Sequence, residues 1–295
     1  MSTDFTGMHW MLATPFDDDE ALDTGSIPRL VAKAREVGCN GLVALGVTGE
    51  VARLTDRERW TVAEKVVASA EGMPVTLGTS AASTQVAIAY SKGAQTLGAS
   101  AVMVAAPPMA KPNLDALLVH YQRIADAVDL PIVVQDYPLT TGVQMPVPFI
   151  ARLAEEVPSA RYLKLEDPPT PTKIRAIREL IGDRMGIFGG LGGVFLLDEL
   201  AQGSAGAMTG FAYPEVLVDV CRHMAEGDRA KAEEVFHRHL PLILFESQEG
   251  IGLAIRKEAL HHRGLIGTPR VRHPGGPVGD ATRQELLHLI DALGL

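Results

Sequence analysis

The segment YLKLE, residues 162–166, puts a lysine in the middle of a short apolar run. Alternate side chains of a β-strand point to opposite faces, so Tyr162, Lys164 and Glu166 share one face. Leu163 and Leu165 occupy the other, and they suit a face that helices cover. Lys164 is thereby turned toward the interior of a closed sheet. A strand buried on both faces is typical of a parallel β-barrel.

Seven further runs have the same character. They are short, rich in apolar residues and bounded by glycine, proline or polar residues, as buried parallel strands are. Longer amphipathic stretches separate them and predict helices. The eight expected strands are 9–14, 41–45, 74–79, 101–106, 131–136, 162–166, 186–190 and 205–210. The expected helices are 27–37, 56–70, 84–97, 113–128, 148–156, 171–181, 194–202 and 214–225.

Eight strand–helix units in succession predict an α/β fold of the (β/α)8, or TIM-barrel, type over residues 1–227. An open doubly wound sheet is the alternative, but no dinucleotide-binding glycine fingerprint follows the first strand. Residues 228–295 predict three more helices, over 229–245, 251–262 and 282–293. We expect them to form a C-terminal helical extension packed on the barrel rather than an independent domain.

The composition narrows the range of partners. A net charge of −9 without a basic run argues against nucleic acid or an anionic membrane surface. No apolar stretch approaches the length of a transmembrane helix, and no secretory signal is evident, so a cytoplasmic location is expected. Cys39 and Cys221 have no metal or disulfide spacing, and the histidines are dispersed. Neither a metal nor another cofactor is therefore expected.

Lys164 is the first candidate for chemistry. The other lysines fall in helical patterns, helix ends or loops, where a solvated ammonium is the default. Burial inside a barrel disfavours the charged form, and a neutral amine can attack a carbonyl carbon. The alternative is structural: an ion pair between Lys164 and Glu166 that braces the barrel.

A second candidate is the turn GVTGE, residues 46–50, which follows the second expected strand. In a barrel, catalytic and binding groups lie in the loops at the C-terminal ends of the strands. The two glycines let the backbone turn sharply and offer N–H groups to an anion such as a carboxylate, and Thr48 adds a hydroxyl. An ordinary strand–helix connection is the alternative reading of the same residues.

In order and spacing, five features resemble the dihydrodipicolinate synthase/N-acetylneuraminate lyase family: LATPF (12–16), GVTGE, AAPPMAKP (105–112), YPLTTG (137–142) and the lysine of the sixth strand. The resemblance implies a (β/α)8 barrel, a homo-oligomer (tetramer or dimer) and Schiff-base chemistry on pyruvate or another 2-oxo acid. By the same resemblance, Lys164 forms the Schiff base. Thr48 and the backbone of Gly49 would hold the substrate carboxylate, and Gly190 would line the pocket.

Positions that carry a proton relay in that family differ here. Gln135 stands where the resemblance places a tyrosine, with Asp136 in place of the following asparagine, and Val47 replaces a hydroxyl residue. Pro108-Met109 occupy the place of a second tyrosine in the synthase branch, and Thr140 that of an arginine. The synthase reaction of lysine biosynthesis is therefore not expected.

Two other residues are candidates for general acid/base catalysis. Tyr137 would share a face with Gln135 if the strand continued that far, and Glu166 shares the face of Lys164. The alternatives are that Tyr137 only packs at the lip and that Glu166 only balances the charge of Lys164. A set of apolar side chains near the strand ends predicts a less polar second substrate or product: Val47, Pro108, Met109, Met208 and Phe211. Gln135 and Met208 are expected to contact the substrate.

Three functions fit these observations. The leading hypothesis is a lyase, an aldolase or hydro-lyase, that forms a Schiff base between Lys164 and a 2-oxo acid. The second is a barrel that kept the pocket but lost turnover and binds a small carboxylic acid as a sensor or structural protein. The third is a lyase that uses Glu166 as a base without a covalent step.

Overall fold

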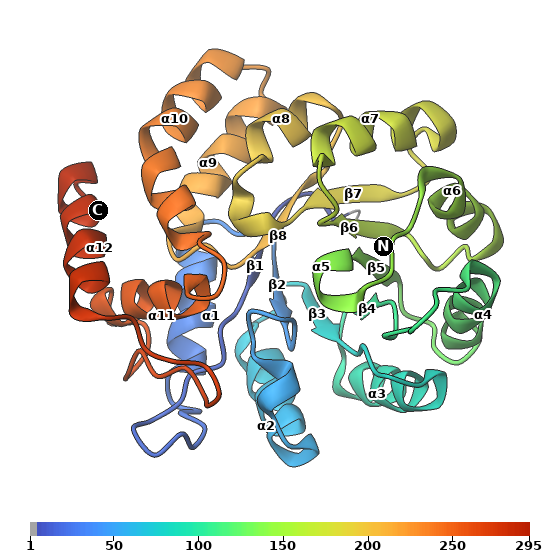
Figure 1. Cartoon of the computed structure of the whole chain (residues 1–295), viewed down its shortest axis with the longest axis horizontal. Helices are drawn as coiled ribbons and strands as arrows, with labels where there is room; N and C mark the ends of the chain where they lie inside the picture. Colours follow the sequence, from blue (N-terminus) through green and yellow to red (C-terminus); the bar gives the residue numbers. More distant parts are fainter. Residues whose placement is uncertain (1–4) are drawn as a thin grey trace.

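A computed structural model describes residues 5–295 and places eight parallel strands in a closed barrel, each paired with its neighbour in sequence and β8 with β1. The predicted (β/α)8 fold is confirmed, and an open sheet is excluded. Figure 1 shows the helices arranged around the strands. The strands are β1 (Gly7–Met11), β2 (Gly41–Ala44), β3 (Val75–Gly78), β4 (Ala101–Ala105), β5 (Ile132–Asp136), β6 (Tyr162–Leu165), β7 (Gly186–Gly189) and β8 (Gly206–Thr209).

Helices follow each strand and cover the outside of the barrel. The barrel helices are α1 (Ile27–Glu36), α2 (Asp56–Ser69), α3 (Thr84–Leu97), α4 (Leu114–Ala125), α5 (Pro138–Thr141), α6 (Val147–Glu156), α7 (Thr170–Ile181), α8 (Leu196–Ala201) and α9 (Pro214–Ala225). Two 3-10 turns, η1 (Val51–Arg53) and η2 (Leu191–Gly193), lie after β2 and β7. The short helix α5 was not expected from the sequence.

The side chains of the strands divide into two layers, as their alternation predicts. Leu163 and Leu165 belong to the large apolar core between the sheet and the helices. Tyr162 belongs to a smaller cluster with side chains from six other strands, which fills the barrel interior. The members of the inner cluster that lie on strands are Met11, Val43, Ala101, Met103, Val133, Tyr162, Phe188 and Met208. The barrel is therefore packed below the level of Lys164.

The ends of the second and fifth strands each have a clear local cause. The second strand ends at Ala44 because Leu45 takes a left-handed conformation with φ 62°. The fifth ends at Asp136, as predicted, and Pro138, whose ring fixes φ and which has no N–H to donate, opens helix α5. The strand does not continue to Tyr137, so the condition under which Tyr137 would share the face of Gln135 is not met.

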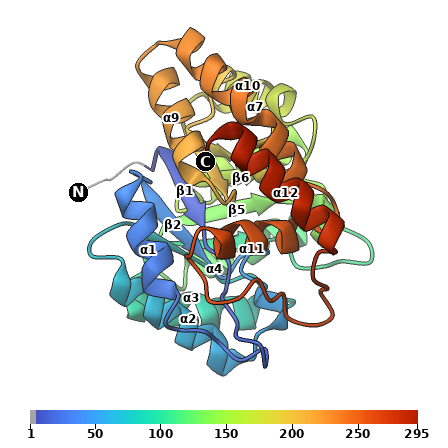
Figure 2. The same ribbon diagram turned by 90° about the vertical axis from the view of Figure 1, so that its left-hand side faces the viewer.

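Three helices of the C-terminal part follow the barrel: α10 (Arg229–Glu246), α11 (Gly252–His262) and α12 (Asp280–Leu293). Helix α10 packs against α9 and η2, and α12 packs against α10 and α11. Figure 2 shows α12 lying across α10 and α11 on one side of the molecule. The expected boundary at 227/228 falls in the short connection between α9 and α10, and the division into two parts stays a prediction.

One lysine outside the barrel is not solvated, contrary to the sequence-based expectation. Lys257 is 0% exposed and its ammonium lies 2.5 Å from the Glu50 carboxylate and 2.7 Å from the Arg270 carbonyl oxygen. Its partners lie far away in sequence, so a helical pattern alone could not reveal the pairing. Cys39 and Cys221 are both buried and free. Within residues 5–295 no helix is long and apolar enough to span a membrane; residues 1–4, part of the segment that lacks a signal pattern, lie outside the described residues.

Candidate active site

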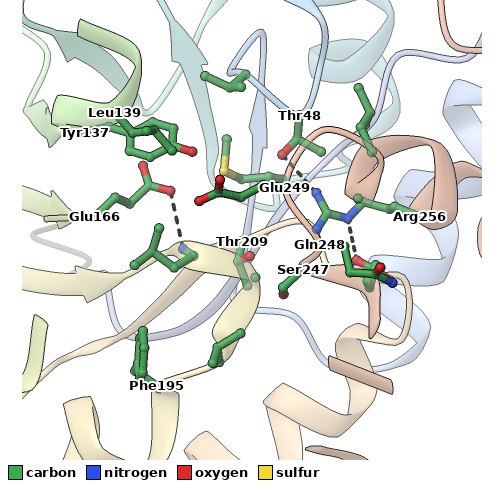
Figure 3. Close-up of a pocket in the computed structure, with 18 of the residues that line it drawn as sticks. Thr48, Tyr137, Leu139, Glu166, Phe195, Thr209, Ser247, Gln248, Glu249 and Arg256 are labelled. Carbon is green, nitrogen blue, oxygen red and sulfur yellow. Dashed lines mark hydrogen bonds and ion pairs between the residues drawn. The ribbon is translucent and has the colours of Figure 1, made fainter. Parts of the chain in front are cut away.

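A pocket of about 580 Å³ opens at the C-terminal ends of the barrel strands, where Lys164 lies in its wall. Its residues come from the strands β1, β6 and β8, from the segments that follow β2, β5, β6 and β7, and from the end of α10, the start of α11 and the segment between them. Figure 3 shows their side chains converging on one space. Its polar and charged lining residues are Thr48, Tyr137, Lys164, Glu166, Thr209, Glu246, Ser247, Gln248, Glu249 and Arg256.

Lys164 points into this pocket from β6, as the alternation predicts. Its side chain is 2% exposed, and its Nζ lies 2.9 Å from Glu166 Oε2 and 3.0 Å from Met11 Sδ. The ion pair that was considered as a structural alternative is thus present. An ion pair at the wall of a pocket does not exclude chemistry, because the amine is within reach of a bound small molecule.

Glu166 follows the last residue of β6 and is held by three donors. Its Oε2 accepts a hydrogen bond from Gln135 Nε2 at 2.7 Å as well as the contact with Lys164. Its Oε1 accepts from the backbone N–H of Leu191 at 3.4 Å. Three donors and no acceptor face the carboxyl, which is the hydrogen-bonding pattern of a carboxylate.

Gln135 and Gly190 both act on Glu166 rather than on the pocket surface. Gln135 is 3% exposed and, like Gly190, is not among the pocket-lining residues. A Cβ at position 190 would lie 2.4 Å from Glu166 Cγ, so only glycine leaves room for this carboxylate. The expected direct contacts of these two residues with a substrate are therefore not supported by their positions.

Tyr137 lines the pocket from the residue that precedes α5. It is half-buried, and burial together with the charges of Glu166 and Glu249 raises the pKa of its phenol. Figure 3 shows Tyr137 and Glu166 on the same side of the pocket, with Glu249 facing them. A hydroxyl with this environment stays protonated at neutral pH and can donate a proton or a hydrogen bond.

In the GVTGE turn, Val47 and Thr48 reach the pocket and Gly49 does not. The N–H of Gly49 bonds to the Gly46 carbonyl oxygen at 3.0 Å, and the Gly49 carbonyl oxygen accepts from Thr14 Oγ1 at 2.7 Å. The position of Gly49 does not support the expected contact of its backbone with a substrate carboxylate, because the turn itself uses this donor. Among the described residues, the N–H groups of Val47 and Thr48 have no partner.

The apolar part of the pocket consists of other residues than expected. Met208 belongs to the packed barrel interior, Phe211 is 0% exposed, and neither Pro108 nor Met109 lines the pocket. Of the expected apolar set only Val47 is correctly placed. The strand period places a residue on a face, but it does not give the depth at which packing ends and the pocket begins. The apolar lining residues are Met11, Val47, Leu139, Leu191, Val194, Phe195 and Leu253.

Arg256 is the main functional candidate that the sequence did not reveal. It comes from α11, which the sequence marks only as part of a helical extension, yet its guanidinium lines the pocket and donates to Thr48 Oγ1 at 3.3 Å. Arg256 Nε lies 2.5 Å from Glu246 Oε1, the last residue of α10. The available signal was the run of three charged residues Arg256, Lys257 and Glu258 in a largely apolar stretch of the helix.

The chain matches the dihydrodipicolinate synthetase family over residues 4–293. It is 34% identical, over 287 residues, to the L-2-keto-3-deoxyarabonate dehydratase of Azospirillum brasilense, a match that covers 95% of this chain and 92% of that protein. Among solved structures it resembles dihydrodipicolinate synthase from Rhodopseudomonas palustris, with a TM-score of 0.93, 36% identity and 97% of both chains covered. It also resembles the enzyme of that name from Acinetobacter baumannii, solved in complex with pyruvate, with a TM-score of 0.92, 29% identity and 99% of both chains covered. Further relatives, 30–34% identical, are named 4-hydroxy-tetrahydrodipicolinate synthase.

Proposed function

The chain belongs to the dihydrodipicolinate synthetase family and is an enzyme of the lyase type, and from this premise we propose that it is a Schiff-base hydro-lyase that removes water from a 2-oxo-3-deoxy acid. The observation that carries the proposal is the pair formed by Lys164 and Glu166, 2.9 Å apart at the wall of the pocket. It supplies a nucleophilic amine and a carboxylate at one place.

The covalent step belongs to Lys164. After Lys164 has released its proton, its amine adds to the C2 carbonyl of the 2-oxo acid. The carbinolamine takes up one proton on its oxygen and loses one water, which gives an iminium ion bonded to Nζ. The iminium withdraws electrons from C3 and makes the C3 protons acidic. The position of Lys164 supports this role, because its amine is shielded from bulk water, at 2% exposure, and forms part of the pocket wall.

Glu166 is proposed to move the proton. Because C3 is two bonds from Nζ, a carboxylate that contacts Nζ is close enough to take a proton from C3. The resulting enamine expels the C4 hydroxyl, which takes the proton back from Glu166 and leaves as water. Hydrolysis of the imine consumes one water, frees Lys164 and releases an unsaturated 2-oxo acid.

We favour dehydration over the synthase reaction as the activity of this chain on chemical grounds. The family resemblance assigns proton transfer to a tyrosine at position 135, where this chain has a glutamine that cannot transfer a proton and that instead bonds to Glu166. A dehydratase is among the relatives, which supports this assignment, but many relatives are named synthase. That this chain lacks the synthase activity stays a prediction.

The test combines trapping with product analysis. Incubation with pyruvate and borohydride should add the reduced adduct to Lys164, and a 2-oxo-3-deoxy acid with a C4 hydroxyl should lose water without releasing pyruvate. Release of pyruvate would assign aldol cleavage instead, and formation of 4-hydroxy-tetrahydrodipicolinate would assign the synthase reaction. Binding without turnover over a broad panel of 2-oxo acids would support the sensor hypothesis.

The oligomeric state and the cellular location are proposed from membership of the same family. We infer that the chain forms a homo-oligomer, a dimer or a tetramer, acts in the cytoplasm and takes only a small-molecule substrate. Light scattering of the purified protein tests the assembly. A monomer at micromolar concentration would contradict it.

A further inference from the structure

Arg256 reaches the pocket from outside the barrel. It lies in the second turn of α11 and is 9% exposed, and its guanidinium forms part of the pocket wall. A guanidinium is always charged and carries five N–H donors in a planar fork that matches a carboxylate. A nearly buried arginine at a pocket wall needs a partner that compensates its charge. The donors that this partner leaves free are available to an anion in the pocket.

Glu246 compensates the positive charge of Arg256 through a contact with its Nε. Its side chain is 1% exposed, with one carboxylate oxygen 2.5 Å from Arg256 Nε and the other accepting the backbone N–H of Ala212 at 2.9 Å. Glu246 engages only the Nε side of the guanidinium. The arrangement holds the fork in one orientation, because both oxygens of the carboxylate are fixed.

The Nη side of the fork faces Thr48. Arg256 Nη1 donates to Thr48 Oγ1 at 3.3 Å, and among the described residues Nη2 has no hydrogen-bond partner. Figure 3 shows Arg256 and Thr48 pointing toward one another across the edge of the pocket. A Cβ at position 210 would lie 2.7 Å from Thr48 Cγ2 and 3.1 Å from Arg256 Nη1, so Gly210 provides the space in which they meet.

This corner of the pocket lies next to the reactive amine. The same Cβ position at residue 210 is 2.9 Å from the Met11 carbonyl oxygen, and the Met11 sulfur contacts Lys164 Nζ at 3.0 Å. Met11 therefore lies between the Thr48–Arg256 corner and Lys164. In a 2-oxo acid the carboxylate is bonded directly to C2, the atom that Lys164 attacks. A carboxylate-binding group must lie near Lys164, as this corner does.

The turn itself offers few donors for a carboxylate. Val47 has no hydroxyl, and the N–H groups of Gly49 and Glu50 are bonded within the turn. Resting on the function proposed above, we propose that Arg256 completes this site. With Thr48 and the free N–H groups of the turn, its guanidinium binds the carboxylate of the 2-oxo acid and makes the enzyme select anionic over neutral ketones.

The experiment compares two ketones that differ only in this charge. Pyruvate carries the carboxylate and pyruvamide a neutral amide, and both present the same C2 carbonyl to Lys164. Trapping by borohydride at subsaturating ketone should favour pyruvate in the wild-type protein. In Arg256→Met the preference should fall by about 10- to 100-fold, the value of a charge-assisted hydrogen bond, while the rate with pyruvamide changes little.

The variants must separate binding from folding. Arg256→Met leaves Glu246 buried without its partner, so the double variant Glu246→Gln/Arg256→Met, which buries no unpaired charge, should lose the same preference. Arg256→Lys should retain part of it. As a matched control, Arg270→Met removes a half-exposed guanidinium outside the pocket lining and should leave the ratio unchanged. An equal fall for both ketones, or an unchanged ratio, would overturn the proposal and leave Arg256 a structural residue.

A non-covalent measurement keeps this result separate from the Schiff-base proposal. Lactate and lactamide cannot form an imine, and calorimetry measures their binding directly. The wild-type protein should bind lactate more tightly than lactamide, and the double variant should not. If neither ketone is trapped at Lys164 but this difference holds, the covalent mechanism fails and the role of Arg256 stands. If the wild-type protein binds lactate and lactamide equally, the proposed role of Arg256 is contradicted, whether or not Lys164 forms a Schiff base.

Discussion

Two residues, Lys164 and Glu166, lie 2.9 Å apart but have separable tasks in the proposed reaction. Glu166→Gln removes the proton acceptor and keeps the shape, so kcat for dehydration should fall by about 100- to 10,000-fold, the usual contribution of general acid–base catalysis. Trapping of pyruvate at position 164 should persist in this variant, and Lys164→Ala should abolish both. Activity that survives Lys164→Ala but not Glu166→Gln would favour catalysis without a covalent step.

Gly190 offers an independent check on the position of Glu166. Because a Cβ at this residue would lie 2.4 Å from Glu166 Cγ, Gly190→Ala should displace the carboxylate and lower kcat by at least tenfold, with a smaller effect on trapping. Gly276→Ala is the matched control, since a Cβ there meets nothing within 4 Å. Equal kinetics for the two variants would show that the position of Glu166 does not matter for turnover.

At the residue scale, the sequence predicted what depends on local pattern. The alternation of YLKLE was sufficient to predict that Lys164 points inward. The positions of Thr48 and Tyr137 just after strands were sufficient to predict that they lie near the pocket. Arg256 and the internal use of the Gly49 N–H were not predictable. The first depends on where α11 packs, and the second on the hydrogen bonds within one turn.

At the element scale, α11 and the GVTGE turn are joined by a buried ion-pair network. Glu50 accepts from Lys257 at 2.5 Å, from Arg53 at 2.7 Å and from the Arg272 backbone N–H at 3.0 Å. Lys257→Met leaves a buried carboxylate without its closest partner and should cost about 3 kcal/mol in denaturant unfolding. The KM for a 2-oxo acid should rise as well, because the same turn carries Thr48.

The matched variant for this network is Lys257→Met/Glu50→Gln. It removes both buried charges, so it should recover much of the lost stability. Full stability in the single variant would mean that Arg53, whose side chain is 30% exposed, is sufficient for Glu50. In sequence, six of the eight strands lie between Glu50 and Lys257. The order of strands and helices could therefore be predicted, but this connection could not.

At the scale of the whole molecule, buried histidines link barrel packing to pH. His9 in β1 is 1% exposed among Phe5 and Phe188, and burial, which outweighs an interaction with the Thr6 backbone, lowers its pKa to about 4. The unfolded chain binds a proton at His9 below about pH 6.5 and the folded chain only near pH 4. This histidine therefore destabilises the fold progressively as the pH falls through that window.

Replacing His9 should make this effect measurable. The stability of His9→Leu relative to the wild-type protein should rise by about 2 kcal/mol between pH 7 and pH 5 in denaturant unfolding. The comparison must be relative, because burial raises the pKa of Asp136 to about 6 and of Glu199 to about 7, which acts in the opposite direction. His288→Leu, an exposed position, is the control. A pH-independent difference for His9→Leu would show that the ring is protonated in the folded state.

The C-terminal helices bear on the whole molecule because they complete both the core and the pocket. Phe236, Leu242 and Ile243 of α10 are buried, and Glu246 and Arg256 form part of the pocket wall. A chain ended after residue 227 would expose the apolar surface of α9 and lose the proposed carboxylate site, so it should neither unfold cooperatively nor trap pyruvate. A chain ended after residue 293, which lacks only the exposed residues Gly294 and Leu295, should do both. A soluble 1–227 chain with a cooperative thermal transition would instead establish the barrel as an independent domain, with the extension contributing only to the site.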